Sequence, residues 1–265
     1  MNIARSTFYY RGKTASPGKE GDVIDKIEAI CLEFPGYGYR RVTKQLRNEE
    51  LVINHKRVLR LMRESDLLCR AKRKRTNTTN SKHPFPRYPN LIKDLVVSGM
   101  NQVWLADITY IRIRNGFVYL AAVLDAYSRR VIGYAISTSL ETPLTLKALS
   151  MAIAARHPAP GVIHHSDQGI QYASGDYVEE LRRSGFRISM ARTGNPYENA
   201  TMESFFKTLK YEEVYLCDYE TLADVLERIP YFIEEVYNRK RLHSALAYLS
   251  PINFETLALI SRNRE

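Results

Sequence analysis

The sequence of 265 residues lacks the usual features of secreted proteins, of membrane-spanning proteins and of proteins with a structural zinc ion. Its three cysteines, Cys31, Cys69 and Cys217, are scattered and form no CxxC pair. This spacing argues against a structural zinc site and for a reducing compartment. No apolar run approaches the length of a membrane span, and the N-terminus has no signal-peptide core. These absences predict a cytoplasmic protein without a membrane partner.

Positive charge is concentrated in the first third of the chain. Residues 1–90 carry 20 Lys/Arg against 9 Asp/Glu, a net charge of +11, whereas residues 91–265 carry 19 against 20, a net charge of −1. This asymmetry predicts a polyanion held by the N-terminal third. Nucleic acid is favoured over a membrane surface, because no strongly amphipathic basic helix with bulky aromatic residues is evident.

Residues 1–70 are predicted to form a basic, all-α region like a helix-turn-helix unit. Apolar residues recur at helical spacing over 22–34, 40–50 and 55–65, and Asn54 is a good N-cap for the third helix. The inner face of that helix is expected to carry Val58, Leu59 and Met62. The basic side chains outside are candidate DNA contacts: Arg40, Arg41, Lys44, Lys56, Arg57 and Arg60. The alternative is a basic bundle used only for packing, and the charge asymmetry favours DNA.

Residues 71–95 are predicted to be a basic, proline-bearing linker. They begin with Lys72, Arg73, Lys74 and Arg75, which could bind phosphates as a tether between two folded units. Basic tetrads are common and are usually only solvated, so this signal is weak.

Residues 96–258 change to a pattern of strands and then alternating helices and strands. This order predicts a mixed, five-stranded α/β sheet with helices on both sides. The expected strands are 103–113, 117–124, 131–137, 162–165 and 187–190. The expected helices are 142–156, 177–183, one beginning at Asn195 and a long helical C-terminus from Thr221.

Two aspartates stand where this sheet would gather ligands. Asp107 lies in the middle of a strand that is apolar on both faces, where an ionised carboxylate is costly unless a cation compensates it. Asp167 follows a short strand, at the carboxyl end where open sheets bind ligands. An aspartate before glycine is also a common turn residue, so Asp167 alone leaves both interpretations open.

The helix after the fifth strand adds a third carboxylate. Asn195 is its expected cap and Glu198 its capping-box residue, while Met202, Phe205, Phe206 and Leu209 form one apolar stripe. Glu203, Lys207 and Lys210 fall on a second stripe, which alone would indicate surface Glu–Lys pairing. Together with Asp107 and Asp167, however, Glu203 predicts a hard-cation site that suits Mg²⁺.

The set Asp107, Asp167 and Glu203, with 35 residues between the last two, resembles the DD(35)E core of retroviral integrases and many transposases. More narrowly, several phrases resemble the second-frame (OrfB) transposases of the insertion-sequence-three type: VWLADITYI, HHSDQGIQY, GNPYENATMESFFKTLK and YNRKRLHSALAYLSPINF. The block YGYRRVTKQL resembles the helix-turn-helix-like segment before that core. Together these motifs cover most of residues 37–254.

The resemblance implies a ribonuclease-H-like fold and cleavage and joining of insertion-sequence ends. It implies two Mg²⁺ ions per active site, with Mn²⁺ expected to substitute. Asp107 and Asp167 would hold the ions and Glu203 would complete one site, while Lys207 and Lys210 match a spacing that integrases use to hold element-end DNA. The implied partners are terminal-repeat and target DNA, further copies of the chain on paired ends, and an upstream-frame (OrfA) product as partner or fusion. The implied location is the bacterial nucleoid.

The sequence therefore predicts the catalytic subunit of a Mg²⁺-dependent DNA transposase. One alternative is a ribonuclease-H-like nuclease, which would not require the basic front or the YNRKRLHSALAYLSP segment. The other is a DNA-binding regulator that is inactive without its upstream-frame partner, since the chain begins at MNIARSTFYY without a separate helix-turn-helix and coiled coil.

Other polar residues are expected to have structural roles. Asp125 is predicted to be a turn residue beside Ser128, and His164 and His165 to serve core packing. Arg239, Arg241 and His243 are open between DNA contact and charge pairing near a helix end.

Overall fold

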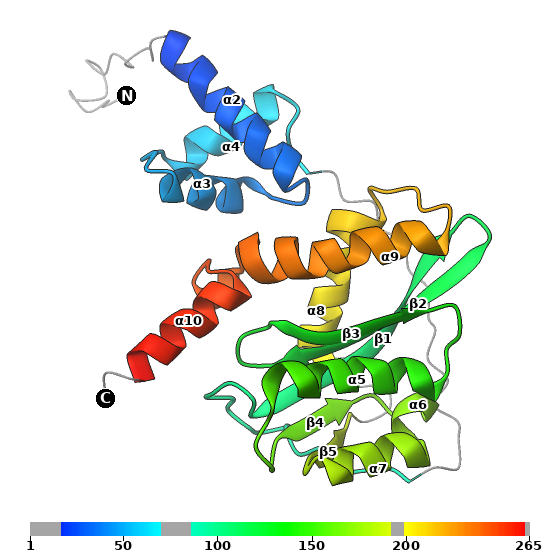
Figure 1. Ribbon diagram of the computed structural model, residues 1–265. Coiled ribbons are helices and arrows are strands. Elements are labelled where there is room, and N and C mark those ends of the chain that lie inside the picture. Colours follow the sequence, from blue (N-terminus) through cyan, green and yellow to red (C-terminus); the bar gives the residue numbers. More distant parts are fainter. Residues whose placement is uncertain (1–16, 70–85, 192–198, 263–265) are drawn as a thin grey trace, which may run out of the picture. The chain divides into compact units, whose positions relative to one another are not determined.

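The computed structural model describes residues 17–69, 86–191 and 199–262. The chain divides into two compact units, Met1–Arg70 and Ala71–Glu265, coloured blue to cyan and cyan to red in Figure 1. The expected linker contacts Lys72, Arg73, Lys74 and Arg75 lie outside the described residues, as do the expected helix caps Asn195 and Glu198.

The described part of the first unit is helical: α2 (Pro17–Glu33), α3 (Tyr39–Asn48) and α4 (His55–Glu64). The Asn54 side chain caps α4 as predicted, accepting a hydrogen bond from the Lys56 amide at 2.8 Å. Val58 and Met62 are buried as expected, but Leu59 is only half-buried and Leu61 is the third inner residue. Two of the three expected inner residues of α4 are therefore confirmed, and Leu61 takes the place of Leu59.

The second unit is built on a five-stranded sheet, as predicted. Its described strands are β1 (Val103–Ile113), β2 (Gly116–Asp125), β3 (Val131–Ser137), β4 (Ile163–Ser166) and β5 (Arg187–Met190). The order is β3-β2-β1-β4-β5, with β1 antiparallel to β2 and parallel to β4, and β4 parallel to β5. β1 is thus the central strand, which explains its nearly continuous apolar sequence.

Helices cover both faces of this sheet (Figure 1). One face carries α5 (Thr142–Arg156), α6 (Ile170–Ala173) and α7 (Gly175–Arg183), packed on even-numbered residues of β1 such as Trp104 and Ala106. The other carries α8 (Ala200–Leu209) and α9 (Leu222–Tyr231), packed on odd-numbered residues such as Val103 and Leu105. By this alternation Asp107 faces the α8 side.

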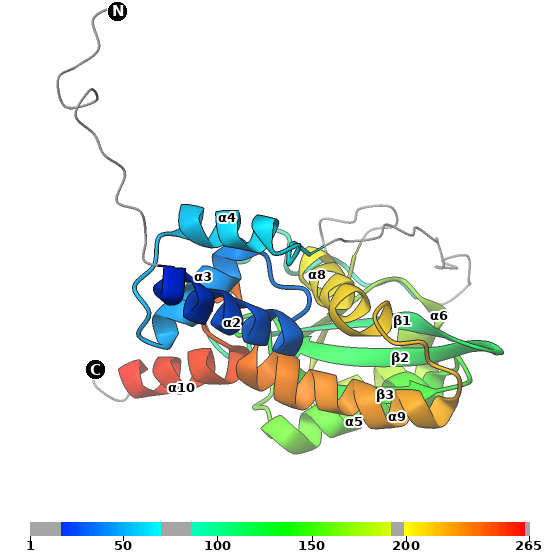
Figure 2. The ribbon, with the colours of Figure 1, turned by 90° about the horizontal axis from the view of Figure 1, so that it is seen from above.

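The C-terminal segment is helical from Thr221, as predicted, but not uniformly α-helical. Helix α9 continues as the π-helix η3 (Phe232–Lys240), and together they form the long orange rod of Figure 2. In the same way, α8 continues as the π-helix η2 (Lys210–Val214). The rod is fixed to the sheet by Asn238, which exchanges hydrogen bonds with the backbone of Val131 at 2.9 and 3.0 Å.

The last described elements of the chain are the short 3-10 helix η4 (Ser244–Leu246) and the helix α10 (Pro251–Arg262). Glu255 ties α10 to the sheet unit, because its buried carboxylate accepts from Ser128 at 2.6 Å and from Arg130 at 2.9 Å and also pairs with Arg156. Among the described residues, the model contains no helix that is both long and apolar enough to traverse a bilayer.

Candidate active site

Asp107 and Asp167 come from neighbouring parallel strands. In the β1–β4 ladder Ala106 pairs with Ser166, so the two aspartates directly follow one paired position. β4 ends there, and beyond it β1 continues to Ile113 paired with β2. The two carboxylates therefore meet where the parallel pairing of β1 stops.

Asp107 is the electrostatic centre of the site. Burial and the neighbouring Asp167 carboxylate raise its pKa from 3.8 to about 8, and Glu203 acts in the same direction. The Ile108 amide, which donates to Asp107 Oδ1 at 2.7 Å, and the Lys210 ammonium oppose this rise. Asp167, Glu203 and Lys210 therefore all lie within electrostatic range of Asp107.

Asp167 begins the loop between β4 and α6. Its Oδ1 accepts a hydrogen bond from the Gly169 amide at 2.9 Å, which holds the carboxylate against the turn. A Cβ at position 169 would lie 2.9 Å from that same oxygen, so the close approach requires glycine. The turn interpretation of Asp167 is therefore confirmed, and the same carboxylate also acts on the pKa of Asp107.

Helix α8 presents the third carboxylate. Met202, Phe205 and Leu209 are fully buried against the sheet, as their spacing predicts, while Glu203 and Lys207 are exposed. The helix begins at Ala200 with Asn199 at its N-cap position and without a side-chain cap hydrogen bond. The packed stripe fixes the rotation of α8, so Glu203 lies at the rim of the buried face.

Lys210 joins the site to a neighbouring aromatic side chain. It is half-buried, with its ammonium 4.3 Å from the centre of the Tyr110 ring, a cation–π distance. Burial lowers the pKa of Lys210, and the Asp107 carboxylate opposes that fall. Lys210 was predictable as a site residue from its helical spacing and the family resemblance, but Tyr110 was not, because nothing in a lone tyrosine of a strand signals this contact.

Tyr172, on α6, is a further residue of the site that sequence analysis missed. Its hydroxyl is buried and has no hydrogen-bond partner among the described residues. Burial and Tyr177 raise its pKa, and so do the Asp107 and Asp167 charges. The only signal in the sequence was its place in the phrase HHSDQGIQY.

The chemistry of this set fits a hydrated hard cation. Carboxylate oxygens are the ligands that Mg²⁺ prefers, and a cation would relieve the repulsion that raises the pKa of Asp107. In the part of the chain that the structure describes, however, no three His, Cys, Asp or Glu side chains are close enough to enclose one ion. Glu203 therefore acts on Asp107 through space without closing a ligand cage.

The turn and core predictions for the other polar candidates hold. The buried Asp125 accepts from the amides of Asn101, Tyr127 and Ser128 at 2.7–3.1 Å. His164 is buried against the Tyr177 hydroxyl at 3.0 Å, and burial lowers its pKa to about 3. His165 is buried with Nδ1 2.8 Å from the Ser189 hydroxyl. These residues support the strand ends that carry Asp167.

For the arginines near the end of η3, the structure supports charge pairing. Arg241 is buried and donates two hydrogen bonds of 2.6 Å to Glu212, a fork-shaped pair. Arg239 lies 3.4 Å from Glu235, one helical turn away. His243 is buried beside the Tyr237 ring.

The basic candidates of the first unit lie on α3 and α4, as expected: Arg40, Arg41 and Lys44 on α3, and Lys56, Arg57 and Arg60 on α4. Two of them already have carboxylate partners, since Arg57 and Arg60 lie 3.4 and 2.5 Å from Glu20. Arg60 also pairs with Glu64 at 2.8 Å. DNA contact by these residues stays a prediction.

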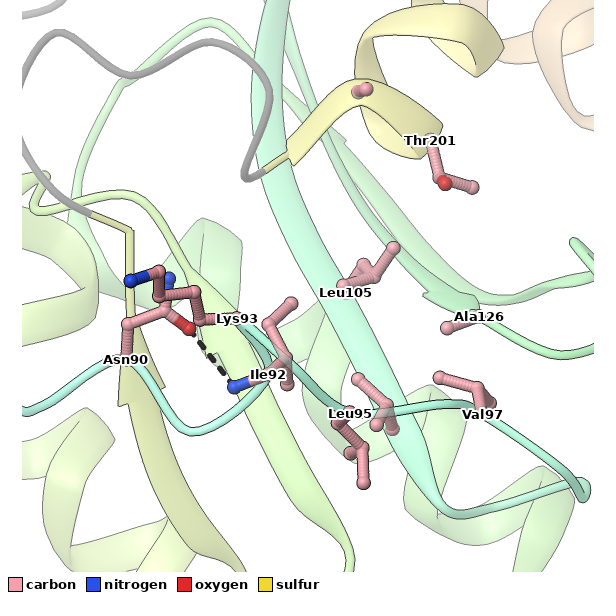
Figure 3. Close-up of a pocket in the computed structure, with 10 residues that line it drawn as sticks. Asn90, Ile92, Lys93, Leu95, Val97, Leu105, Ala126 and Thr201 are labelled. Atoms are coloured by element: carbon pink, nitrogen blue, oxygen red, sulfur yellow. Dashed lines mark hydrogen bonds between the residues drawn. The ribbon is translucent and has the colours of Figure 1, made fainter.

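A cavity of about 400 Å³ lies near the start of α8 (Figure 3). Its lining is mostly apolar, with Ile92, Leu95 and Leu105 among the residues drawn. Asn90 is turned back onto its own segment, accepting from the Ile92 amide at 2.9 Å (dashed in Figure 3). None of the three carboxylates lines this cavity, so it is not the site of the chemistry.

Three family models match the chain: an integrase core domain over residues 98–196, a second integrase core domain over 184–251 and an HTH-like domain over 19–75. It is 42% identical to the transposase for insertion sequence element IS904 of Lactococcus lactis, over 87% of this chain and 92% of the relative. It is 39% identical to transposase InsF for insertion sequence IS3A of Escherichia coli, over 86% of this chain and 80% of the relative.

Among solved structures, a chain of the simian T-cell lymphotropic virus intasome in complex with PP2A regulatory subunit B56 gamma matches with a TM-score of 0.50. The match covers 87% of this chain and 74% of that one at 17% identity, which supports the integrase-type fold alone. The sequence identities go further: the chain belongs to the IS3 family of insertion-sequence transposases.

Proposed function

We propose that this chain is the catalytic subunit of a DNA transposase that cleaves insertion-sequence ends and joins the resulting 3′-hydroxyl ends to DNA. The observation that carries the proposal is that Asp167, Glu203 and Lys210 lie within electrostatic range of Asp107, in a chain of a transposase family. Acidic groups held together against their own repulsion are expected where a cation and a phosphodiester are to be bound.

The three carboxylates of the proposed site differ in how firmly the fold holds them. Asp107 and Asp167 are fixed by a strand and a hydrogen-bonded turn, so they would hold the cations in a constant position. Glu203, exposed on α8 and outside any three-carboxylate cage in the described structure, would have to move toward the two aspartates to complete one ion site. Two bound Mg²⁺ ions, or Mn²⁺ in their place, would activate a water or a 3′-hydroxyl and stabilise the departing 3′-oxygen. Ligation requires the Asp107 carboxylate to be ionised, so cation binding would release a proton near neutral pH.

The lysines of the second stripe would hold the substrate. Lys207 is exposed and Lys210 is half-buried beside Asp107, so their ammonium groups would bind phosphates on the strand that enters the site. The basic first unit would supply most of the affinity for terminal-repeat and target DNA. Action on paired ends implies several copies of the chain, and an upstream-frame product would join them as partner or fusion on the bacterial nucleoid.

The decisive experiment is strand transfer with labelled end DNA and Mg²⁺. The chain is assayed by itself and fused to the upstream-frame product. We expect joined products from at least one form, and loss of both cleavage and joining in Asp107→Ala, Asp167→Ala and Glu203→Ala while DNA binding persists. Asp94→Ala, an exposed aspartate of the same unit, is the matched control and should remain active.

Other outcomes would assign another function. Cleavage without joining in every form would indicate a ribonuclease-H-like nuclease. Binding without cleavage in every form would indicate a DNA-binding regulator. Activity retained by any one of the three carboxylate variants would refute the assignment of that carboxylate.

A further inference from the structure

A second cavity, of about 760 Å³, opens along the part of β1 that extends beyond β4. We call it the aromatic groove. Its walls come from the β1–β2 hairpin and from η2 with the segment that follows it. Cavities of roughly 300–1,000 Å³ are typical of sites that hold a small molecule or one unit of a polymer. The residues that matter here are Tyr110, Arg112, Arg114, Phe117, Lys210 and Tyr215.

Aromatic rings are unusually exposed in this groove. Phe117 is 49% and Tyr215 is 44% exposed, although large apolar side chains are normally covered. Each packs perpendicular to another ring: Phe117 against Tyr110 at a centroid distance of 5.4 Å, and Tyr215 against Tyr211 at the same distance. A perpendicular partner covers at most one face of a ring, so the partner ring leaves the other face open to a flat ligand.

Cationic side chains border the rings. Arg112 and Arg114 are exposed, and Lys210 lies over Tyr110 within electrostatic range of Asp107. Asp218 and Glu220 also line the groove, and Glu220 lies 3.5 Å from Arg114. Both partners of that pair are largely exposed, so a phosphate could displace the carboxylate at little cost.

The wall behind the rings is braced. The Arg114 amide donates to the Tyr219 carbonyl at 3.1 Å, which joins the hairpin to the segment after η2. Glu213 accepts from the Tyr219 hydroxyl at 2.8 Å and from Arg228 at 2.7 Å. The groove is therefore a preformed feature of the catalytic unit.

We propose that the aromatic groove binds an unpaired nucleotide of the DNA strand that enters the active site, with its base stacked on Tyr215 or Phe117. The assignment rests on the proposed function of the same chain, because Lys210 belongs to both the groove and the carboxylate site. Open ring faces select unpaired bases, since the bases of a duplex stack on each other. Arg112, Arg114 and Lys210 would hold the flanking phosphates.

The test measures binding without divalent ions, so that it does not depend on catalysis. The probes are a short fluorescein-labelled oligothymidylate and a fully paired duplex of the same length, followed by fluorescence anisotropy with the full chain. Salt is raised until the electrostatic contribution of the basic first unit is weak, because stacking persists when phosphate contacts are screened. Tyr215→Ala and Phe117→Ala are compared with Tyr231→Ala, a 58% exposed tyrosine on α9 outside the groove.

We expect at least one groove variant to weaken oligothymidylate binding by roughly 5- to 100-fold and to leave duplex binding unchanged. Tyr215→Phe, which keeps the ring, should restore any loss seen in Tyr215→Ala. Equal losses for both probes, or no loss beyond that of Tyr231→Ala, would overturn the proposal. Strand transfer measured on the same preparations separates the two ideas: base-selective binding without strand transfer would count against the transposase function alone.

Discussion

Because the pKa of Asp107 is raised, we predict that replacing this residue by an uncharged one stabilises the protein, although the residue belongs to the proposed active site. A pKa raised from 3.8 to about 8 means that folding is disfavoured wherever the unfolded carboxylate is ionised. Below about pH 4 the Asp107 carboxyl is protonated in both the folded and the unfolded state and costs no stability. As the pH rises from about 4 to about 8, the free energy of unfolding decreases, and above pH 8 it decreases no further. At about 1.4 kcal/mol per pH unit between the unfolded pKa of 3.8 and pH 7, the free energy of unfolding falls by at most about 4.5 kcal/mol.

Replacing Asp107 by Asn removes the charge and keeps an oxygen that can accept from the Ile108 amide. Because the side chain is half-buried and solvent screens part of the repulsion, we expect a gain of about 2 kcal/mol at pH 7. For a unit of this size, that gain raises the Tm by roughly 4–8 °C in EDTA. The advantage should shrink as the pH falls toward 4.

Trp104 offers a clean assay. It is the only tryptophan of the chain and is fully buried in the catalytic unit, so its fluorescence follows unfolding of that unit. Thermal melts of the wild type and Asp107→Asn are compared from pH 4 to 8, with Asp94→Asn as the exposed control. Mg²⁺ should then raise the Tm of the wild type more than that of Asp107→Asn. An Asp107→Asn protein that is no more stable than the wild type in EDTA at any pH would refute the reasoning.

Three further predictions concern other parts of the molecule. DNA affinity should fall steeply with salt, and a chain lacking residues 1–90 should lose most of that slope; a flat response would contradict the charge argument. Gly133→Ala should destabilise the catalytic unit by about 1–3 kcal/mol in urea unfolding, because the new Cβ would lie 2.3 Å from a carbonyl oxygen of α5, whereas Gly99→Ala meets nothing within 4 Å. Glu255→Gln should cost about 3 kcal/mol, because it leaves the Arg156 cation poorly compensated, and the loss should disappear well below pH 4.5, where the wild-type carboxylate also protonates.

Much of the fold was predictable because its elements have clear local signals. The expected bounds of β1, β3, α5 and β5 are those of the structure. In each case an apolar run or periodic stripe stands between residues that break it. Asp107 stood out for the same reason, because a carboxylate inside an apolar strand contradicts its surroundings, whereas Asp167 before a glycine left the turn interpretation equally open and was assigned to the site only in combination with Asp107 and Glu203 and by the family resemblance.

What could not be predicted depends on contacts between distant parts of the sequence. The π-helical continuations η2 and η3 follow α8 and α9 without any break in the helical pattern. The aromatic groove brings Phe117 next to η2 only because β1 carries the hairpin past the end of β4. Tyr110 and Tyr172 are ordinary tyrosines until folding places the Lys210 ammonium over the Tyr110 ring and brings the buried Tyr172 within electrostatic range of Asp107 and Asp167.

The distribution of charge suggests how affinity and chemistry are divided in this chain. Residues 91–265 carry a net charge of −1 and gather acidic groups around Asp107, so the proposed active site would repel a DNA substrate. Residues 1–90, with a net charge of +11, would attract the same substrate. Substitutions in the two parts should therefore have different effects. Those in the first unit should change Kd and its salt dependence, whereas those among the carboxylates should change kcat and leave Kd nearly constant.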